Sequence, residues 1–242
     1  MKDSLQDLVS HIHGLVDIDV IKIMGTAQDT SFAAVSQRED GKIVIEGSLT
    51  TPDPEFIGTF GMPNLVKLKT ILGFEEYNEN ANIYTNRDNE GVAKSINFEN
   101  KNKDFVNSYR LMAESIVVEK VKTVIFKGTT WNIEFAPTVD NIMRLKKQAQ
   151  ANAEENLFKV KVENGDLRIH FGDPATHSGN FVFHSQVSGT LANTLQFPVS
   201  LVIQILSMVG NKTMRISERG ILEITIDSGI ATYRYLVPAH GK

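Results

Sequence analysis

Short runs in which apolar and polar residues alternate dominate the chain, and turn residues separate them. A period of two is typical of half-buried strands. It predicts strands at SFAAVSQ, KIVIEG, DLRIHF, NFVFHSQV, KTMRIS, ILEITI and ATYRYLV. Asp40-Gly41 and Asn164-Gly165 lie between such runs. Both dipeptides tolerate the positive φ angles of a type I′ turn, so we expect a hairpin at each.

Four segments instead carry apolar residues at helical spacing. They are Ser4–His13, Pro63–Leu72, Thr138–Gln150 and Pro198–Val209. Pro63 suits the first turn of its helix. On the first helix the apolar stripe leaves Asp7 on the outer face. The fourth segment is apolar nearly all round, so we expect it to be well buried.

The order of these elements repeats. Each half gives a helix, about four strands, a second helix and about three strands, and each half ends in a Tyr-Arg pair, at Tyr109 and Tyr233. Such a repeat predicts two similar domains in tandem. We place an N-terminal domain at residues 1–112, a connector at 113–130 and a C-terminal domain at 131–242. The expected class is α+β, with two helices packed on antiparallel sheets in each domain.

Composition narrows the class of protein. Apolar residues make up 41% of the 242 residues and charged residues 22%, as in a soluble globular protein. No apolar run is long enough to span a membrane, and MKDSLQDLVSHIHG lacks the apolar stretch of a signal peptide. We therefore expect a cytoplasmic protein. The absence of cysteine excludes disulfides and thiolate metal sites. The net charge of −4 gives no global attraction to nucleic acid.

Three stretches resemble a known family. They are FGMPNLVKLKTIL (Phe60–Leu72), QFPVSLVIQILSMV (Gln196–Val209) and the ending ILEITIDSGIATYRYLVPAH (Ile221–His240). Together with the tandem repeat, they are similar to the DNA polymerase sliding clamps of the PCNA type and of T-even phages. The resemblance implies a ring-forming homotrimer that encircles duplex DNA and tethers the replicative polymerase after loading by a clamp loader. The short, divergent subunit resembles a bacteriophage protein, which would work in the host cytoplasm or nucleoid.

A ring that slides on DNA needs basic residues on its inner wall, which meet phosphates without reading sequence. On Thr138–Gln150, Arg144 and Lys147 point away from the apolar stripe. Asp7 would present an acid on the first helix. The alternative is that these are ordinary solvated helix faces. The DNA-facing residues that we expect are Lys2, Lys67, Lys69, Arg144, Lys146, Lys147 and Lys212.

The chain from Pro174 to Asn211 has no Asp, Glu, Lys or Arg. It includes the alternating run Asn180–Val187. An exposed edge strand is normally guarded by charge, so an unguarded one suggests that its edge pairs with another chain. In clamps, subunits join by continuing a sheet. The alternative is a strand in the middle of a sheet. The expected subunit-interface residues are Phe181, Phe183, Ser185 and Tyr109.

The connector LMAESIVVEKVKT (Leu111–Thr123) follows the first Tyr-Arg pair. In clamps, the connector and the C-terminal strand end form an apolar pocket where polymerases and loaders dock a short peptide. The resemblance implies that Ile116, Val117, Val118, Leu236, Val237 and Pro238 line it. The alternative is that these side chains pack against their own sheets.

The sequence gives no sign of catalysis. It has no Gly-rich phosphate loop, no HExxH and no nucleophile elbow. His11 and His13 diverge on a helix and make a poor metal pair. We expect no enzyme activity, no cofactor and no metal site. Two alternatives stay open: a structural protein of a virion or assembly with two tandem β-rich domains, and a single-strand DNA binder, for which no exposed row of aromatic residues is visible.

Overall fold

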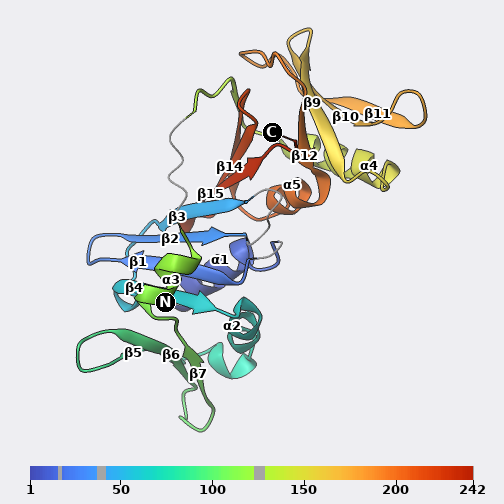
Figure 1. The fold of residues 1–242 in the computed structure, drawn as a ribbon. Helices are drawn as coiled ribbons and strands as arrows, with labels where there is room; N and C mark the ends of the chain where they lie inside the picture. Colours follow the sequence, from blue (N-terminus) through green and yellow to red (C-terminus); the bar gives the residue numbers. More distant parts are fainter. Residues whose placement is uncertain (16–17, 37–41, 123–128, 242) are drawn as a thin grey trace. The chain divides into compact units, whose positions relative to one another are not determined.

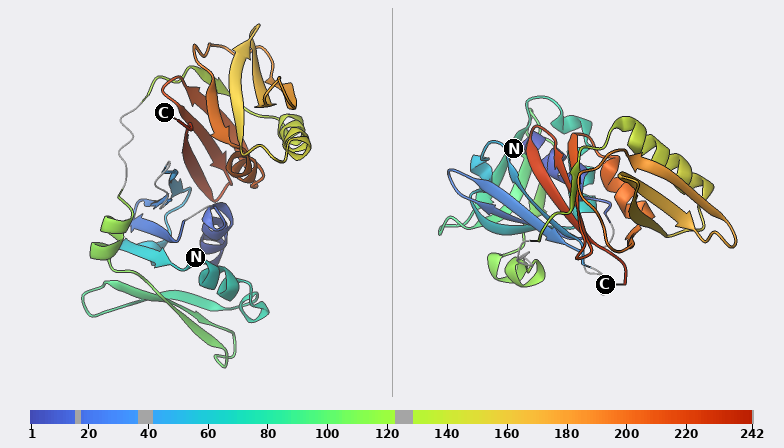
Figure 2. Two further views of the ribbon diagram at one scale, coloured as in Figure 1. Left: turned by 45° about the vertical axis from the view of Figure 1, so that its right-hand side comes forward. Right: turned by 90° about the horizontal axis from the view of Figure 1, so that it is seen from above.

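A computed structural model describes residues 1–15, 18–36, 42–122 and 129–241. Within them the chain forms two compact units (Figures 1 and 2). The first contains residues 1–15, 18–36, 44–122 and 227–233. The second contains residues 42–43, 129–226 and 234–241. No helix in the described ranges is long and apolar enough to cross a membrane.

The first unit has two sheets. The strands are β1 (Val20–Gly25), β2 (Thr30–Val35), β3 (Val44–Leu49), β4 (Gly58–Pro63), β5 (Asn82–Arg87), β6 (Ala93–Glu99) and β7 (Val106–Arg110). The first sheet has the order β4-β1-β2-β3, and the second has the order β5-β6-β7. All described pairings are antiparallel. The predicted Asp40-Gly41 turn lies outside the described residues, between the antiparallel strands β2 and β3.

Three α-helices accompany these sheets: α1 (Lys2–Ile12), α2 (Leu65–Leu72) and α3 (Glu114–Lys120). Two 3₁₀ turns, η1 (Pro54–Phe56) and η2 (Glu75–Tyr77), complete the first unit. Helices α1 and α2 pack against each other, whereas α3 packs on β4 and β1. Figure 2 shows α3 on the opposite face of the strands from α1 and α2.

The second unit repeats this plan. Its strands are β8 (Ile133–Phe135), β9 (Leu157–Glu163), β10 (Asp166–Gly172), β11 (Ser178–His184), β12 (Leu195–Pro198), β13 (Asn211–Ser217), β14 (Ile221–Asp227) and β15 (Ala231–Pro238). Its helices are α4 (Val139–Ala151) and α5 (Val199–Leu206). One sheet has the order β12-β9-β10-β11, which is the same relative order as β4-β1-β2-β3. The order β13-β14-β15 likewise matches β5-β6-β7. The predicted repeat is therefore a repeat of topology.

Local sequence sets the ends of the helices. Asn64 adopts a left-handed conformation with φ 54°, and its Oδ1 accepts a hydrogen bond from Lys67 N, so α2 begins after Pro63. Pro63 belongs to β4, and its predicted place in the first helical turn is wrong. At α4 the Thr138 and Asn141 side chains each accept from the other's backbone N–H, which forms a capping box.

The predicted turn at Asn164-Gly165 is confirmed. Both residues have positive φ, 54° and 82°, and they join the antiparallel strands β9 and β10. A type I′ turn needs this geometry at both central positions.

Two interior glycines allow close packing. A Cβ on Gly61 of β4 would lie 2.8 Å from Val117 Cγ2, so the glycine lets α3 approach the sheet. A Cβ on Gly179 of β11 would lie 2.5 Å from Gln148 Oε1, so that glycine lets α4 approach β11. Both glycines therefore serve helix-to-strand contact.

Helix α3 was not predicted. It lies in the segment expected to be a connector, where two adjacent valines and a length of seven residues give little helical signal. Tertiary contacts hold it: Val117 is fully buried, and buried Lys22 of β1 donates to Val121 O at 3.1 Å. Helix formation here depends on packing rather than on propensity.

Candidate DNA-facing helices and strand edges

Helix α2 presents basic side chains away from its buried stripe. Leu65, Leu68, Ile71 and Leu72 are buried, and Lys67 and Lys69 are exposed. Lys69 also acts on the neighbouring helix: burial lowers the pKa of His13, and the charge of Lys69 lowers it further. No acid lies on α2. Both predicted residues therefore present their side chains to solvent.

Helix α4 is the more exposed of the two helices in the second unit, since only Leu145 is fully shielded. Arg144 and Lys147 are exposed, as predicted. The Arg144 guanidinium also lies 5.4 Å from the centre of the Phe181 ring, which holds it against β11. Lys147 therefore offers a freer charge than Arg144.

Lys146 and Lys212 come together in the second unit, from α4 and β13. Burial lowers the pKa of Lys212, and the nearby charge of Lys146 lowers it further. Lys212 Nζ donates to Gly210 O at 2.8 Å. A phosphate beside this pair would relieve the repulsion between the two ammonium groups.

Lys2 has local partners. Its Nζ donates to Tyr77 O at 2.6 Å and to Asn78 Oδ1 at 3.2 Å, and its side chain is half-buried. These contacts tie the start of α1 to η2.

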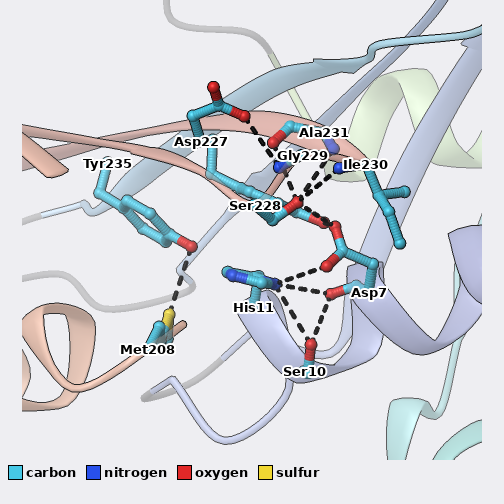
Figure 3. Close-up of polar contacts among 11 residues, drawn as sticks. Asp7, Ser10, His11, Met208, Asp227, Ser228, Gly229, Ile230, Ala231 and Tyr235 are labelled. Carbon is cyan, nitrogen blue, oxygen red and sulfur yellow. Dashed lines mark hydrogen bonds and ion pairs between the residues drawn. The ribbon is translucent and has the colours of Figure 1, made fainter. Parts of the chain in front are cut away.

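The expectation that Asp7 faces outward is wrong. Its carboxylate is 11% exposed and accepts from Ser228 Oγ at 2.8 Å and from Tyr233 OH at 2.6 Å. Figure 3 shows it between α1 and the turn that precedes β15. His11 Nδ1 lies 3.4 Å from Asp7 Oδ1, and the His11 ring stacks on Tyr233 with 4.3 Å between centroids. Residues far apart in sequence therefore enclose the acid that the helical pattern placed on the surface.

Figure 3 also includes Tyr235, whose dashed contact runs to Met208. Its hydroxyl donates to Met208 Sδ at 3.3 Å, within the second unit. Tyr233 and Tyr235 thus belong to different units although they are two residues apart on β15.

The four predicted interface residues lie at or beside two edge strands. β11 ends the order β12-β9-β10-β11, and β7 ends the order β5-β6-β7. Phe181, Phe183 and Tyr109 are buried within their own units, and Ser185 is exposed just after β11. Tyr109 OH donates to Pro63 O, and burial raises the pKa of Tyr109 above its usual range. These edges therefore offer backbone groups and outward side chains, not the buried rings.

The residues predicted to line a peptide pocket divide between the units. Ile116 and Val118 are exposed on α3, and Val117 is buried beneath them. In the second unit, Leu236 and Val237 are buried in β15, and Pro238 is half-buried. Three of the six side chains thus pack against their own sheets.

The described residues contain no group of three or more His, Cys, Asp or Glu side chains that could hold a metal ion.

The fold of the whole chain is that of the PCNA sliding clamps. It matches A. fulgidus PCNA, in a structure with the C-terminal region of FEN-1 bound, at a TM-score of 0.70 and 10% identity over 100% of this chain and 96% of that chain. It matches PCNA from Thermococcus kodakaraensis at a TM-score of 0.68 and 9% identity over 99% and 97%. No protein-family model and no curated protein matches the sequence. The predicted resemblance and the α+β class, with helices on antiparallel sheets, are confirmed.

Proposed function

We propose that this protein is a DNA sliding clamp, a ring of three identical copies that encircles duplex DNA and tethers a replicative polymerase. The full-length likeness to PCNA carries the proposal. A clamp performs no chemistry. Because topology holds the ring on DNA, weak and sequence-independent phosphate contacts suffice. The clamp fold favours this function over a structural role in a virion, and phage origin stays a prediction.

The two edge strands support ring closure. Copies that join head to tail need two different surfaces that fit each other. β7 in the first unit and β11 in the second meet this need, and β11 itself contains no Asp, Glu, Lys or Arg. Pairing β7 of one copy with β11 of the next would continue a sheet across each interface and cover both edges.

The basic residues of α2 and α4 support contact with DNA. We assign Lys67, Lys69, Lys146, Lys147 and Lys212 as the main phosphate contacts, with Arg144 restrained by Phe181 and Lys2 restrained by η2. With Asp7 enclosed, α1 exposes one acid, Asp3, instead of two. Contacts of this kind make binding fall steeply as salt rises.

Partner proteins would dock through short peptides. The C-terminal region of FEN-1 binds A. fulgidus PCNA. We propose that polymerase and clamp-loader peptides bind this chain in the same way. Of the residues expected to contact such a peptide, Ile116 and Val118 in the first unit are exposed, and Pro238 in the second unit is half-buried.

Covalent crosslinking tests ring closure. The chain has no cysteine, so a variant with Val106→Cys on β7 and Ser178→Cys on β11 carries only the two thiols required. A flexible bismaleimide should then produce species of one, two and three linked chains and nothing larger. A longer ladder would mean an open filament, and no linkage between copies would mean that the two edges do not meet.

A further inference from the structure

The four-stranded sheet of the second unit has a second face that the helices do not use. Side chains alternate between the two faces of a strand. On β9 and β10 the inward set is Phe158, Val160, Leu167, Ile169 and Phe171. All of them except Phe171 line one apolar core with Leu145 of α4 and Val202 of α5. The outward set must therefore lie on the face opposite the helices.

That outward set is basic. Lys161 is directly opposite Arg168, and Lys159 is directly opposite His170. Amide side chains flank the second pair: Asn180 of β11 lies opposite His170, and Gln196 of β12 lies opposite Lys159. We call Lys159, Lys161, Arg168 and His170 the β9–β10 basic face. Like charges in directly opposed positions destabilise a sheet, so this arrangement costs stability unless an anion compensates it.

Internal compensation is incomplete. Glu163 Oε2 lies 3.6 Å from Arg168 Nε, and its Oε1 lies 3.5 Å from His170 Nε2. Two further acids lie at the ends of β10: Asp166 accepts from Gln186 N at 3.0 Å, and Asp173 accepts from Ala175 N at 2.9 Å. Within the described part of this face, the single carboxylate of Glu163 thus faces three permanently charged side chains, those of Lys159, Lys161 and Arg168.

The excess of positive charge on this face also affects His170. Its Nε2 is buried and has no hydrogen-bond partner in the described structure. Burial lowers the pKa of His170; Glu163 opposes this, and the charges of Lys161, Arg168 and Lys159 reinforce it. An anion on this face would offset the charges of Lys159, Lys161 and Arg168 and would favour the imidazolium form of His170.

We propose that the β9–β10 basic face binds the phosphodiester backbone of duplex DNA, as a second contact on the face of the sheet opposite the helices. Lys, Arg, Asn and Gln are the residue types that contact phosphates. The phenylalanines of these four strands are buried, so the face lacks the stacking platform that single strands require. It also lacks the aromatic anchors that dominate protein–protein interfaces.

The test measures duplex binding to the full chain by fluorescence anisotropy across a salt series. Lys161→Gln with Arg168→Gln should weaken binding about tenfold at low salt and reduce the salt slope by about 2, roughly one unit for each lost phosphate contact. The matched control removes two exposed lysines from the β6–β7 turn, Lys101→Gln with Lys103→Gln, and should bind like the parent protein. Equal effects in the two double variants would overturn the proposal.

A second arm separates this face from the helices. The variant Lys67→Ala, Arg144→Ala, Lys147→Ala removes helix charges and leaves the β9–β10 basic face intact. Adding duplex to this variant should still raise the pKa of His170, followed by NMR of the imidazole ring. An unchanged His170 pKa would overturn the proposal, and so would a polyglutamate peptide that binds this face more tightly than duplex. If this variant stops sliding but its His170 pKa still rises with duplex, the helices are needed for sliding and the β9–β10 basic face still binds DNA.

Discussion

Asp7 illustrates how a buried carboxylate can stabilise the first unit. It accepts from Tyr233 and Ser228, which come from a segment more than two hundred positions later in the chain. Removing one donor leaves a mostly buried charged oxygen short of a hydrogen bond. Tyr233→Phe should therefore lower the free energy of unfolding by about 1–3 kcal/mol, measured by urea denaturation.

Tyr84→Phe is the matched control for this prediction. Tyr84 OH donates to Glu99 Oε1 at 3.1 Å in a more exposed setting. Its loss should cost less, about 0.5–1 kcal/mol, because water can replace the donor. Equal costs at the two positions would contradict the role given to Asp7.

His170 makes stability depend on pH. Burial, reinforced by three basic neighbours and opposed by Glu163, lowers its pKa below the ordinary value of 6.5. The unfolded chain then binds the proton more tightly than the folded chain. The free energy of unfolding should therefore fall as the pH drops through about 6.5 and below. His170→Asn should lessen that fall, measured by thermal melts between neutral and mildly acid pH; an unchanged profile would count against it.

At the scale of elements, strand β7 tests the assembly. Val106 lies on this edge strand and is 56% exposed. A lysine there would place a charge in the interface between copies and would guard the edge. Val106→Lys should shift the protein toward single chains in sedimentation experiments at micromolar concentration.

Val92→Lys supplies the control for β7. Val92 is 40% exposed and precedes β6, which lies inside its sheet. The same charge change there should leave assembly intact. If both variants assemble like the parent protein, β7 is not an interface strand.

The periodic elements could be predicted from sequence, and the elements held by tertiary contacts could not. Alternation located β10, β14 and β15, and apolar stripes located α1, α2, α4 and α5, with end shifts of one to a few residues. The helical pattern of α1 placed Asp7 in solvent because the pattern carries no information about Ser228 and Tyr233. The short helix α3 was missed because its position depends on Gly61 and Lys22, which are distant in sequence and contact Val117 and Val121.

The candidate site divides in the same way. Helical spacing alone was enough to predict that three basic side chains are exposed, those of Lys67, Arg144 and Lys147. The partners of Lys2 and Arg144 could not be predicted, because η2 and Phe181 reach them only in the folded unit. The β9–β10 basic face had a visible signal, lysines two apart beside an Asn-Gly turn, but its charge deficit depends on strand register.

At the scale of the whole molecule, a sliding clamp binds duplex DNA through electrostatic contacts with its phosphates. Lys67→Ala, Arg144→Ala and Lys147→Ala together should reduce the salt slope of duplex binding by about 2–3, about one unit for each exposed charge lost. A salt slope equal to that of the parent protein would show that these helices do not contact DNA.

Topological capture on DNA tests the central claim most directly. Copies with Val106→Cys and Ser178→Cys are mixed with closed circular plasmid, crosslinked, and washed in high salt, which removes electrostatic contacts. The proposal predicts that crosslinked rings of three chains stay with the circle and are released when one restriction cut makes it linear. Loss of the rings from the intact circle in high salt, or their retention on the linear DNA, would contradict it.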